Sequence, residues 1–143
     1  MTTVACSLLT KSMAVDARIT GGVISHARKI KRVGDSLFGV AGAWEACCQF
    51  LEWIEVRNDR PDLSDEDFEA VELTRSGIFI YHKSLLRVPV LDKYFATGSG
   101  AQGAMVAMSL GCTPKQAVKA VALFDESTGA PFLELTLNAN PKT

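Results

Sequence analysis

Short apolar and β-branched residues dominate the first part of the chain and occur in strand-sized segments. Residues 3–9 predict one strand, the polar residues 10–12 predict a turn, and residues 13–16 predict the returning arm of a hairpin. Because the two arms of a hairpin run side by side, this pairing would bring Thr2 close to Asp16.

Further short segments follow this hairpin. Residues 20–22 form a turn signal, residues 23–25 are extended, and a basic stretch at 28–32 leads to another turn at 34–35. Residues 36–41 then predict a buried strand, which ends at Gly42.

After residue 43 the hydrophobic period changes from two to about 3.6 residues, which predicts an amphipathic helix over 43–57. Its apolar stripe is made of Trp44, Cys47, Cys48, Leu51 and Ile54. Trp44, Phe50 and Trp53 fall on different sides of this helix, so we expect at least one large aromatic side chain to be exposed. Exposed apolar surface of this kind is typical of subunit interfaces.

The rest of the chain alternates between strand and helix signals. The acidic segment 61–67 is expected to be a solvated loop, residues 85–92 to be irregular, and the helix that begins at Thr113 to have a capping box with Gln116. The other predicted elements are a hairpin at 68–74 and 78–81, a strand at 94–97, helices at 99–110 and 113–125, and a strand at 131–137.

Strands grouped into hairpins, with helices between them, favour an α+β fold of packed antiparallel sheets covered by helices. The 143 residues are 48% hydrophobic and 22% charged, which fits one domain over 1–143. With 15 Lys+Arg against 16 Asp+Glu, the chain lacks the basic surface that nucleic-acid binding needs. It has no apolar run of membrane-spanning length and no recognisable signal peptide, so we expect a cytoplasmic protein without a membrane partner.

Several other residues could in principle form a reactive or binding site, but their patterns do not favour one. The four cysteines show no metal-binding spacing, so we expect neither a metal site nor a cofactor. A Cys6–His26 dyad lacks a third, orienting group. Residues 98–103 match the glycine pattern of dinucleotide-binding loops, but a second helix follows where the next strand should be, and a tight turn presenting Ser99 is the better interpretation.

Thr2 is the strongest chemical candidate. Removal of Met1 ahead of a small residue would leave Thr2 with a free α-amine, so that one residue would carry both a nucleophilic hydroxyl and a base. The amine has an ordinary pKa of about 8, near neutral pH. A retained Met1 would block it.

The companions of Thr2 occur in an order that resembles a known family. Asp16-Ala17-Arg18, Lys29-Ile30, Gly39-Val40-Ala41-Gly42, Gly98-Ser99-Gly100 and Asp125 with Thr128-Gly129 together resemble the proteasome β-type subunits. Within that family the pattern is most similar to the HslV-like N-terminal-threonine peptidases. This resemblance implies the four-layer αββα sandwich of N-terminal nucleophile hydrolases.

The resemblance also implies roles for individual residues. Thr2 would be the nucleophile, Lys29 the cation that lowers the pKa of the Thr2 amine, and Asp16 the carboxylate that holds Lys29. The backbone N–H of Gly42 would donate to the oxyanion.

Five further positions follow from the same resemblance. Ser99, Asp125 and Thr128 would form a polar shell around the Thr2 amine, and the family often has Ser at the last of these positions. Thr20 would bind the substrate backbone, and Val40 would line the pocket for the residue before the cleaved bond.

The expected substrate is a peptide or unfolded protein, the expected assembly a homo-oligomeric ring, and a possible partner an ATP-dependent unfoldase. Two alternatives stay open. The chain could be a catalytically idle relative with a structural or assembly role, or an amidase for small molecules, since a fold does not fix its substrate.

Overall fold

The computed structural model describes residues 2–21 and 23–137. It contains three helices, α1 (Trp44–Val56), α2 (Ala101–Ser109) and α3 (Pro114–Ala122). The strands are β1 (Thr3–Ser7), β2 (Ser12–Asp16), β3 (Arg18–Gly21), β4 (Val23–His26), β5 (Ile30–Val33), β6 (Ser36–Gly42), β7 (Phe68–Leu73), β8 (Ile78–Tyr81), β9 (Val88–Val90), β10 (Tyr94–Gly98) and β11 (Phe132–Thr136).

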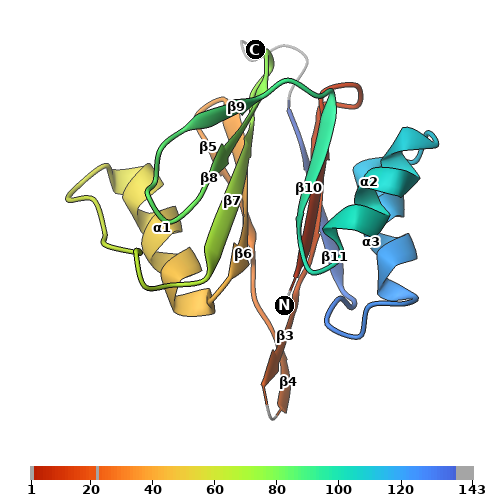
Figure 1. Ribbon diagram of the computed structural model, residues 1–143, viewed down its shortest axis with the longest axis horizontal. Helices are drawn as coiled ribbons and strands as arrows, with labels where there is room; N and C mark the ends of the chain where they lie inside the picture. Colours follow the sequence, from red (N-terminus) through yellow and green to blue (C-terminus); the bar gives the residue numbers. More distant parts are fainter. Residues whose placement is uncertain (1, 22, 138–143) are drawn as a thin grey trace.

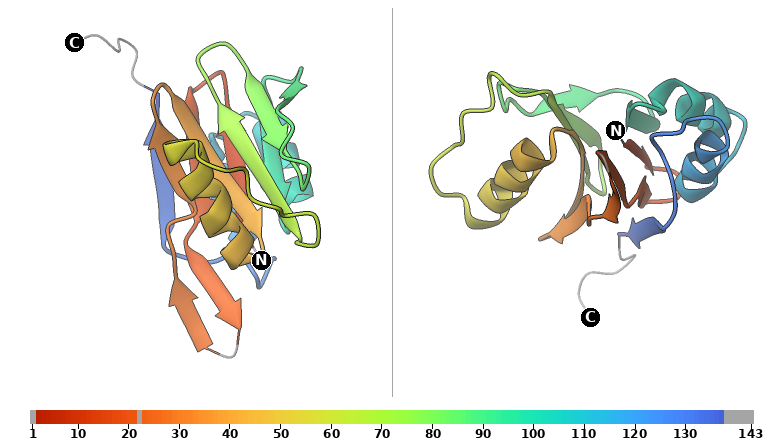
Figure 2. Two further views of the ribbon diagram at one scale, coloured as in Figure 1. Left: turned by 90° about the vertical axis from the view of Figure 1, so that its left-hand side faces the viewer. Right: turned by 90° about the horizontal axis from the view of Figure 1, so that it is seen from below.

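Two antiparallel sheets lie face to face, and helices cover their outer faces (Figure 1). One sheet has the strand order β10-β1-β2-β11 and is covered by α2 and α3. The other has the order β5-β6-β7-β8-β9 and is covered by α1. The view from below in Figure 2 shows the four layers in sequence, so the α+β sandwich expected from the sequence is confirmed.

Three apolar clusters hold these layers together. Val4, Met13 and Leu37 belong to the central cluster between the two sheets, and all three are fully buried. Phe50 anchors the cluster under α1, whereas the cluster under α2 and α3 is made mainly of small residues such as Ala5 and Ala117. Small side chains allow α2 and α3 to pack closely on the sheet they cover, whose strand β1 begins directly after Thr2.

The sequence located most elements well. The first hairpin, α1 and the capping box of α3 are confirmed; the Thr113 hydroxyl accepts from the Gln116 N–H at 3.2 Å, and the Gln116 side chain accepts from the Thr113 N–H at 2.9 Å. The helix predicted over 113–125 ends earlier, at Ala122, and β9 forms inside the segment expected to be irregular.

The predicted buried face of α1 was wrong in detail. Phe50 is fully buried, whereas Cys48 is exposed. Trp44 and Trp53 are half-buried against the same cluster, and Arg57 and Arg60 lie over the Trp53 ring. None of the three aromatic side chains is therefore exposed, because one face packs on the sheet and neighbouring side chains shield the flanks.

The ribbon of β3 and β4 extends beyond the sandwich (Figure 1), and Arg18 and Ile19 at the start of β3 line a pocket together with Thr2. It is a two-stranded sheet of its own, with Arg18 opposite His26 and Gly21 opposite Val23. Among the described helices, none combines the length and the apolar character that crossing a membrane requires.

Candidate active site

The Thr2 side chain meets one acidic and one basic group. The Thr2 hydroxyl donates to Asp16 Oδ1 at 2.8 Å, and Lys29 Nζ donates to the same Thr2 oxygen. Lys29 Nζ also lies 3.7 Å from Asp16 Oδ2. All three side chains are buried, so water screens these interactions little.

The first hairpin produces this contact. Val4 in β1 lies opposite Val15 in β2. Asp16 directly follows this pair on β2 and Thr2 lies two positions before Val4, so both residues are at the open end of the hairpin, where they meet. Lys29 comes from just before β5, in the opposing sheet, and its ammonium also donates to the Arg18 carbonyl. The site is thus built across the two sheets.

Burial is the largest influence on the pKa of Lys29. It lowers the pKa of the ammonium below the ordinary lysine value, while the charge of Asp16 acts in the opposite direction. The Asp16 carboxylate is held by further donors: the Thr3 N–H at 3.1 Å and the Gly129 N–H at 3.2 Å. These fixed bonds orient Asp16 towards both Thr2 and Lys29.

Ser99, Asp125 and Thr128 form a second connected group. The Ser99 and Thr128 hydroxyls donate to Asp125 Oδ2 at 2.5 and 2.8 Å. Partial burial works against ionisation of Asp125, but hydrogen bonds from Ser99, Thr128 and the Ser127 N–H outweigh it and hold the Asp125 pKa below its ordinary value. The three residues that the sequence grouped are therefore brought together.

Backbone bonds join this group to Thr2. The Ser99 N–H donates to the Thr2 carbonyl at 2.7 Å, and the Ser99 hydroxyl lies 3.4 Å from the same oxygen. Thr3 continues the connection, since its hydroxyl pairs with that of Thr128 at 2.8 Å and accepts from the Gly100 N–H at 3.0 Å. The Thr2 carbonyl and the neighbouring Thr3 side chain are thus both held by this group.

Gly42 lies beside Thr2 at the end of β6. Its φ of +113° is unfavourable for other residues, and a Cβ there would overlap the Asp67 carbonyl. Glycine is therefore required at this position, which brings the backbone of residue 42 against the space next to Thr2.

Two pockets meet at this point, and Thr2, Ala41 and Gly42 line both. The smaller one, of about 290 Å³, also contacts Val40, Trp44 and Cys47, and we refer to it as the Trp44 pocket. Val40 thus lines a pocket together with Thr2. Burial raises the pKa of the Cys47 thiol at its wall to about 12, which disfavours the nucleophilic thiolate at neutral pH.

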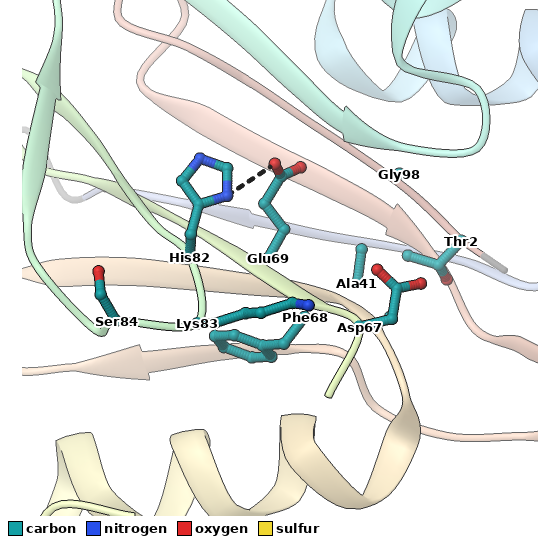
Figure 3. A pocket seen from close by; sticks show the side chains of 10 residues that line it. Thr2, Ala41, Asp67, Phe68, Glu69, His82, Lys83, Ser84 and Gly98 are labelled. Carbon is teal, nitrogen blue, oxygen red and sulfur yellow. Dashed lines mark ion pairs between the residues drawn. The ribbon is translucent and has the colours of Figure 1, made fainter. Parts of the chain in front are cut away.

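The larger pocket, of about 610 Å³, was not expected from the sequence. Asp67, Glu69, His82 and Lys83 give it a polar lining, and we refer to it as the Asp67 pocket (Figure 3). These residues come from the end of the acidic loop, from β7 and from the segment after β8, which the sequence pattern does not bring together.

A buried carboxylate further along β7, Glu72, also escaped the sequence analysis. Glu72 accepts from the Tyr81 hydroxyl and from Arg87 Nε, both at 2.8 Å, and from the Ser36 hydroxyl at 2.7 Å. Burial would raise the Glu72 pKa, but these donors together lower it. Tyr81 and Arg87 lie on either side of His82 and Lys83 in the sequence, so the bonds to Glu72 hold both ends of the segment that contributes these two residues to the Asp67 pocket.

Other candidates are weak or lie outside the description. Thr20 lies in β3, and its side chain is not in the described part; the same holds for the His26 side chain. Cys6 is fully buried in the central cluster, and burial raises its pKa to about 12, which is unsuited to a nucleophile. Residues 98–103 form a turn into α2 rather than a βαβ unit, and the described residues contain no cluster suited to a metal ion.

Comparison with solved structures identifies the fold. Thiobacillus denitrificans BPH in complex with epoxomicin is 19% identical with a TM-score of 0.73, and the match covers 95% of this chain and 99% of that chain. A second structure of BPH is 18% identical with a TM-score of 0.64, covering 97% and 99%. Eukaryotic HslV from Trypanosoma brucei is 16% identical with a TM-score of 0.71, covering 93% and 97%.

No protein-family model and no curated protein matches the sequence. The structural likeness extends over nearly the whole chain and shows that it has the HslV-like sandwich fold. The fold expected from the order of landmarks between Thr2 and Thr128 is therefore confirmed.

Proposed function

We propose that this chain is a threonine peptidase that cleaves peptide bonds with Thr2 after removal of Met1. One observation carries the proposal: the buried Thr2 hydroxyl contacts both Asp16 and Lys29 where two pockets meet. A hydroxyl held between a carboxylate and an ammonium beside open space is suited to nucleophilic attack.

The proposed reaction has two stages. The Thr2 oxygen attacks the substrate carbonyl while its proton passes to the freed α-amine, and the buried charge of Lys29 favours the neutral form of that amine. The Gly42 N–H stabilises the oxyanion. Collapse expels the leaving amine, which takes up the proton, and leaves an ester on Thr2. Water then hydrolyses the ester and restores the hydroxyl.

Ser99, Asp125 and Thr128 are the proposed positioning residues for the amine. Their hydrogen-bonded group adjoins the backbone of Thr2, and the carboxylate of Asp125 supplies negative charge there. The extended backbone of β3 at Thr20 is the proposed binding edge for the substrate, and Val40 contacts the side chain before the cleaved bond.

Fluorogenic peptides test the proposal directly. Intact mass first shows whether Met1 is lost, and turnover is then compared between the wild type, Thr2→Ala and Thr2→Ser. Thr10→Ala serves as a matched control, because Thr10 is exposed in the turn of the first hairpin. We expect turnover by the wild type and Thr10→Ala, partial turnover by Thr2→Ser and none by Thr2→Ala. Equal turnover by all four would refute the proposal.

Epoxomicin gives a second test, since it is the compound bound in one BPH structure of the same fold. We expect it to block turnover and to add its mass to the peptide that begins with Thr2. Retention of Met1 with no adduct would favour the idle, structural role, whereas turnover of small amides but not of peptides would favour the amidase.

A homo-oligomeric ring is the proposed assembly, and an ATP-dependent unfoldase a possible partner. Supporting surface lies at the ends of α2 and α3, where Leu110, Leu123 and Phe124 are largely exposed. Light scattering tests the assembly, and a monomer near 15.4 kDa would contradict it. The proposed compartment is the cytoplasm, because all four cysteines are free thiols.

A further inference from the structure

Of the residues that the structure describes, the two pockets that meet at Thr2 share Thr2, Ala41 and Gly42 and no other lining residue, so they extend from Thr2 in different directions. A peptide bond positioned over Thr2 therefore directs one flank of the substrate to each pocket. If Val40 and the Trp44 pocket take the residue before the cleaved bond, the Asp67 pocket takes the residue after it. This step rests on the proposed function.

Asp67 occupies the part of this pocket next to the cleaved bond. Its carbonyl accepts from the Ala43 N–H at 2.7 Å, which fixes its backbone against Gly42. In Figure 3 its carboxylate lies beside Thr2, on the side of the pocket nearest to that residue. Asp67 is exposed, so a substrate side chain can reach it.

The second carboxylate of the pocket already has a partner. Glu69 Oε2 lies 3.2 Å from His82 Nδ1, as the dashed line in Figure 3 shows. Asp67, in contrast, takes part in no ion pair among the described residues. Burial raises the pKa of Glu69, His82 lowers it, and the nearby charge of Asp67 raises it again. The two carboxylates therefore disfavour each other, and a cation placed between them would relieve this repulsion.

We propose that Asp67 makes this pocket select substrates with Lys or Arg directly after the cleaved bond. The side chain of such a residue would bring its cation to Asp67, which lies next to Thr2 and forms no ion pair within the described part of the chain. An acidic residue at the same place would add a third negative charge.

Lys83 provides a reciprocal test. Lys83 also lines the Asp67 pocket, and its side chain is exposed. Because like charges repel, Lys83 should weaken the attraction that a substrate lysine experiences. Removal of the Lys83 charge should therefore strengthen the preference for Lys after the cleaved bond, whereas removal of the Asp67 charge should weaken it.

Internally quenched peptides that differ only in the residue after the cleaved bond, Lys or Glu, measure this preference, and mass spectrometry identifies the bond that is cut. We expect the wild type to favour the Lys peptide in kcat/KM by between about twofold and fivefold, a range typical of an exposed charge pair. Asp67→Asn should bring the ratio close to one, and Lys83→Ala should increase it. Asp65→Asn is the matched control, because Asp65 lies in the same acidic loop but does not line the pocket.

Binding separates this inference from the proposed function. Thr2→Ala protein is titrated with the same two peptides, so the result does not depend on turnover. If Thr2→Ala binds the Lys peptide more tightly than the Glu peptide, and Thr2→Ala/Asp67→Asn does not, the inference is supported. This holds even if the wild type cleaves neither peptide, because absence of cleavage would refute only the proposed peptidase activity. Cleavage with equal rates and equal binding for both peptides would overturn the inference and leave the peptidase intact.

Discussion

The Thr2 hydroxyl donates a hydrogen bond of 2.8 Å to the carboxylate of Asp16, although fourteen positions separate the two residues. The carboxylate also accepts from the Thr3 and Gly129 N–H groups, so it cannot turn away from Thr2 without losing them. Asp16 thus connects the geometry of the first hairpin to the chemistry proposed for Thr2.

Asp16→Asn should reduce kcat/KM for peptides by at least about a hundredfold, because the amide keeps the shape but loses the charge that holds Lys29. Steady-state kinetics measures the effect, with Asp35→Asn in the exposed turn before β6 as the control. Turnover close to that of the control would show that the charge of Asp16 has no role in the reaction.

Lys29→Ala should abolish turnover while the fold stays intact. The α-amine of Thr2 would lose the neighbouring cation and hold its proton more tightly, so less free base would be present at neutral pH. The Asp16 carboxylate keeps its donors from Thr2, Thr3 and Gly129, which limits the structural damage. Circular dichroism and a peptide assay at pH 7 check both parts; wild-type turnover by the variant would show that the assigned role is wrong.

Gly42→Ala should disrupt the site, because a Cβ there overlaps the Asp67 carbonyl in addition to the strain of a positive φ. Gly111→Ala is a close control: Gly111 has a φ of +102°, and a Cβ there has open space. Chemical denaturation should show a loss of about 1 kcal/mol for the Gly111 variant and a clearly larger loss for the Gly42 variant. Equal losses would mean that the contact with Asp67 adjusts at no cost.

Glu72→Gln should lower the free energy of unfolding by about 2 kcal/mol at pH 7, since a buried charged acceptor with three donors is replaced by a neutral one. The folded-state pKa of Glu72 is lowered, so its contribution is complete above the ordinary value of 4.5 and is lost as the pH falls below it. The difference between wild type and variant should therefore shrink from pH 7 to pH 3.

Urea titrations across this pH range measure that difference. The exposed Glu134→Gln variant on β11 controls for general effects of removing a carboxylate. A difference that stays constant with pH would show that ionised Glu72 does not stabilise the folded state.

Thr113→Ala should cost about 1 kcal/mol of stability, because the N–H of Gln116 loses its capping acceptor. Thermal unfolding measures the loss, and Thr113→Ser should restore most of the stability. A loss in the alanine variant that serine does not restore would contradict the capping role.

Local signals explain what the sequence predicted well. The spacing of Thr113 and Gln116 defines a helix start within four residues, and the hairpin pattern is enough to bring Thr2 to Asp16. The polar group around Asp125 came only from the family resemblance, because nothing local links it to Ser99, twenty-six positions earlier.

Contacts between distant segments explain what it missed. Both faces of the sheet that holds β7 are covered, so Glu72 does not stand out as a buried residue in an alternating pattern. On α1, Phe50 is buried because its ring packs against the rings of Phe68 and Tyr81, with distances between ring centroids of 5.0 and 5.1 Å. The periodicity of one helix carries no information about those partners.

The hydrogen bonds to the peptide group between Thr2 and Thr3 have a kinetic consequence. Chain ends ordinarily fray, and a nucleophile on a fraying end would lose rotational freedom each time it met a substrate. Here the Thr2 carbonyl is bound by Ser99, and the next amide is bound by Asp16. The entropy cost of positioning Thr2 is thus incurred once, when the hairpin folds, so the proposed loss of Met1 would expose an attacking group that is already immobilised.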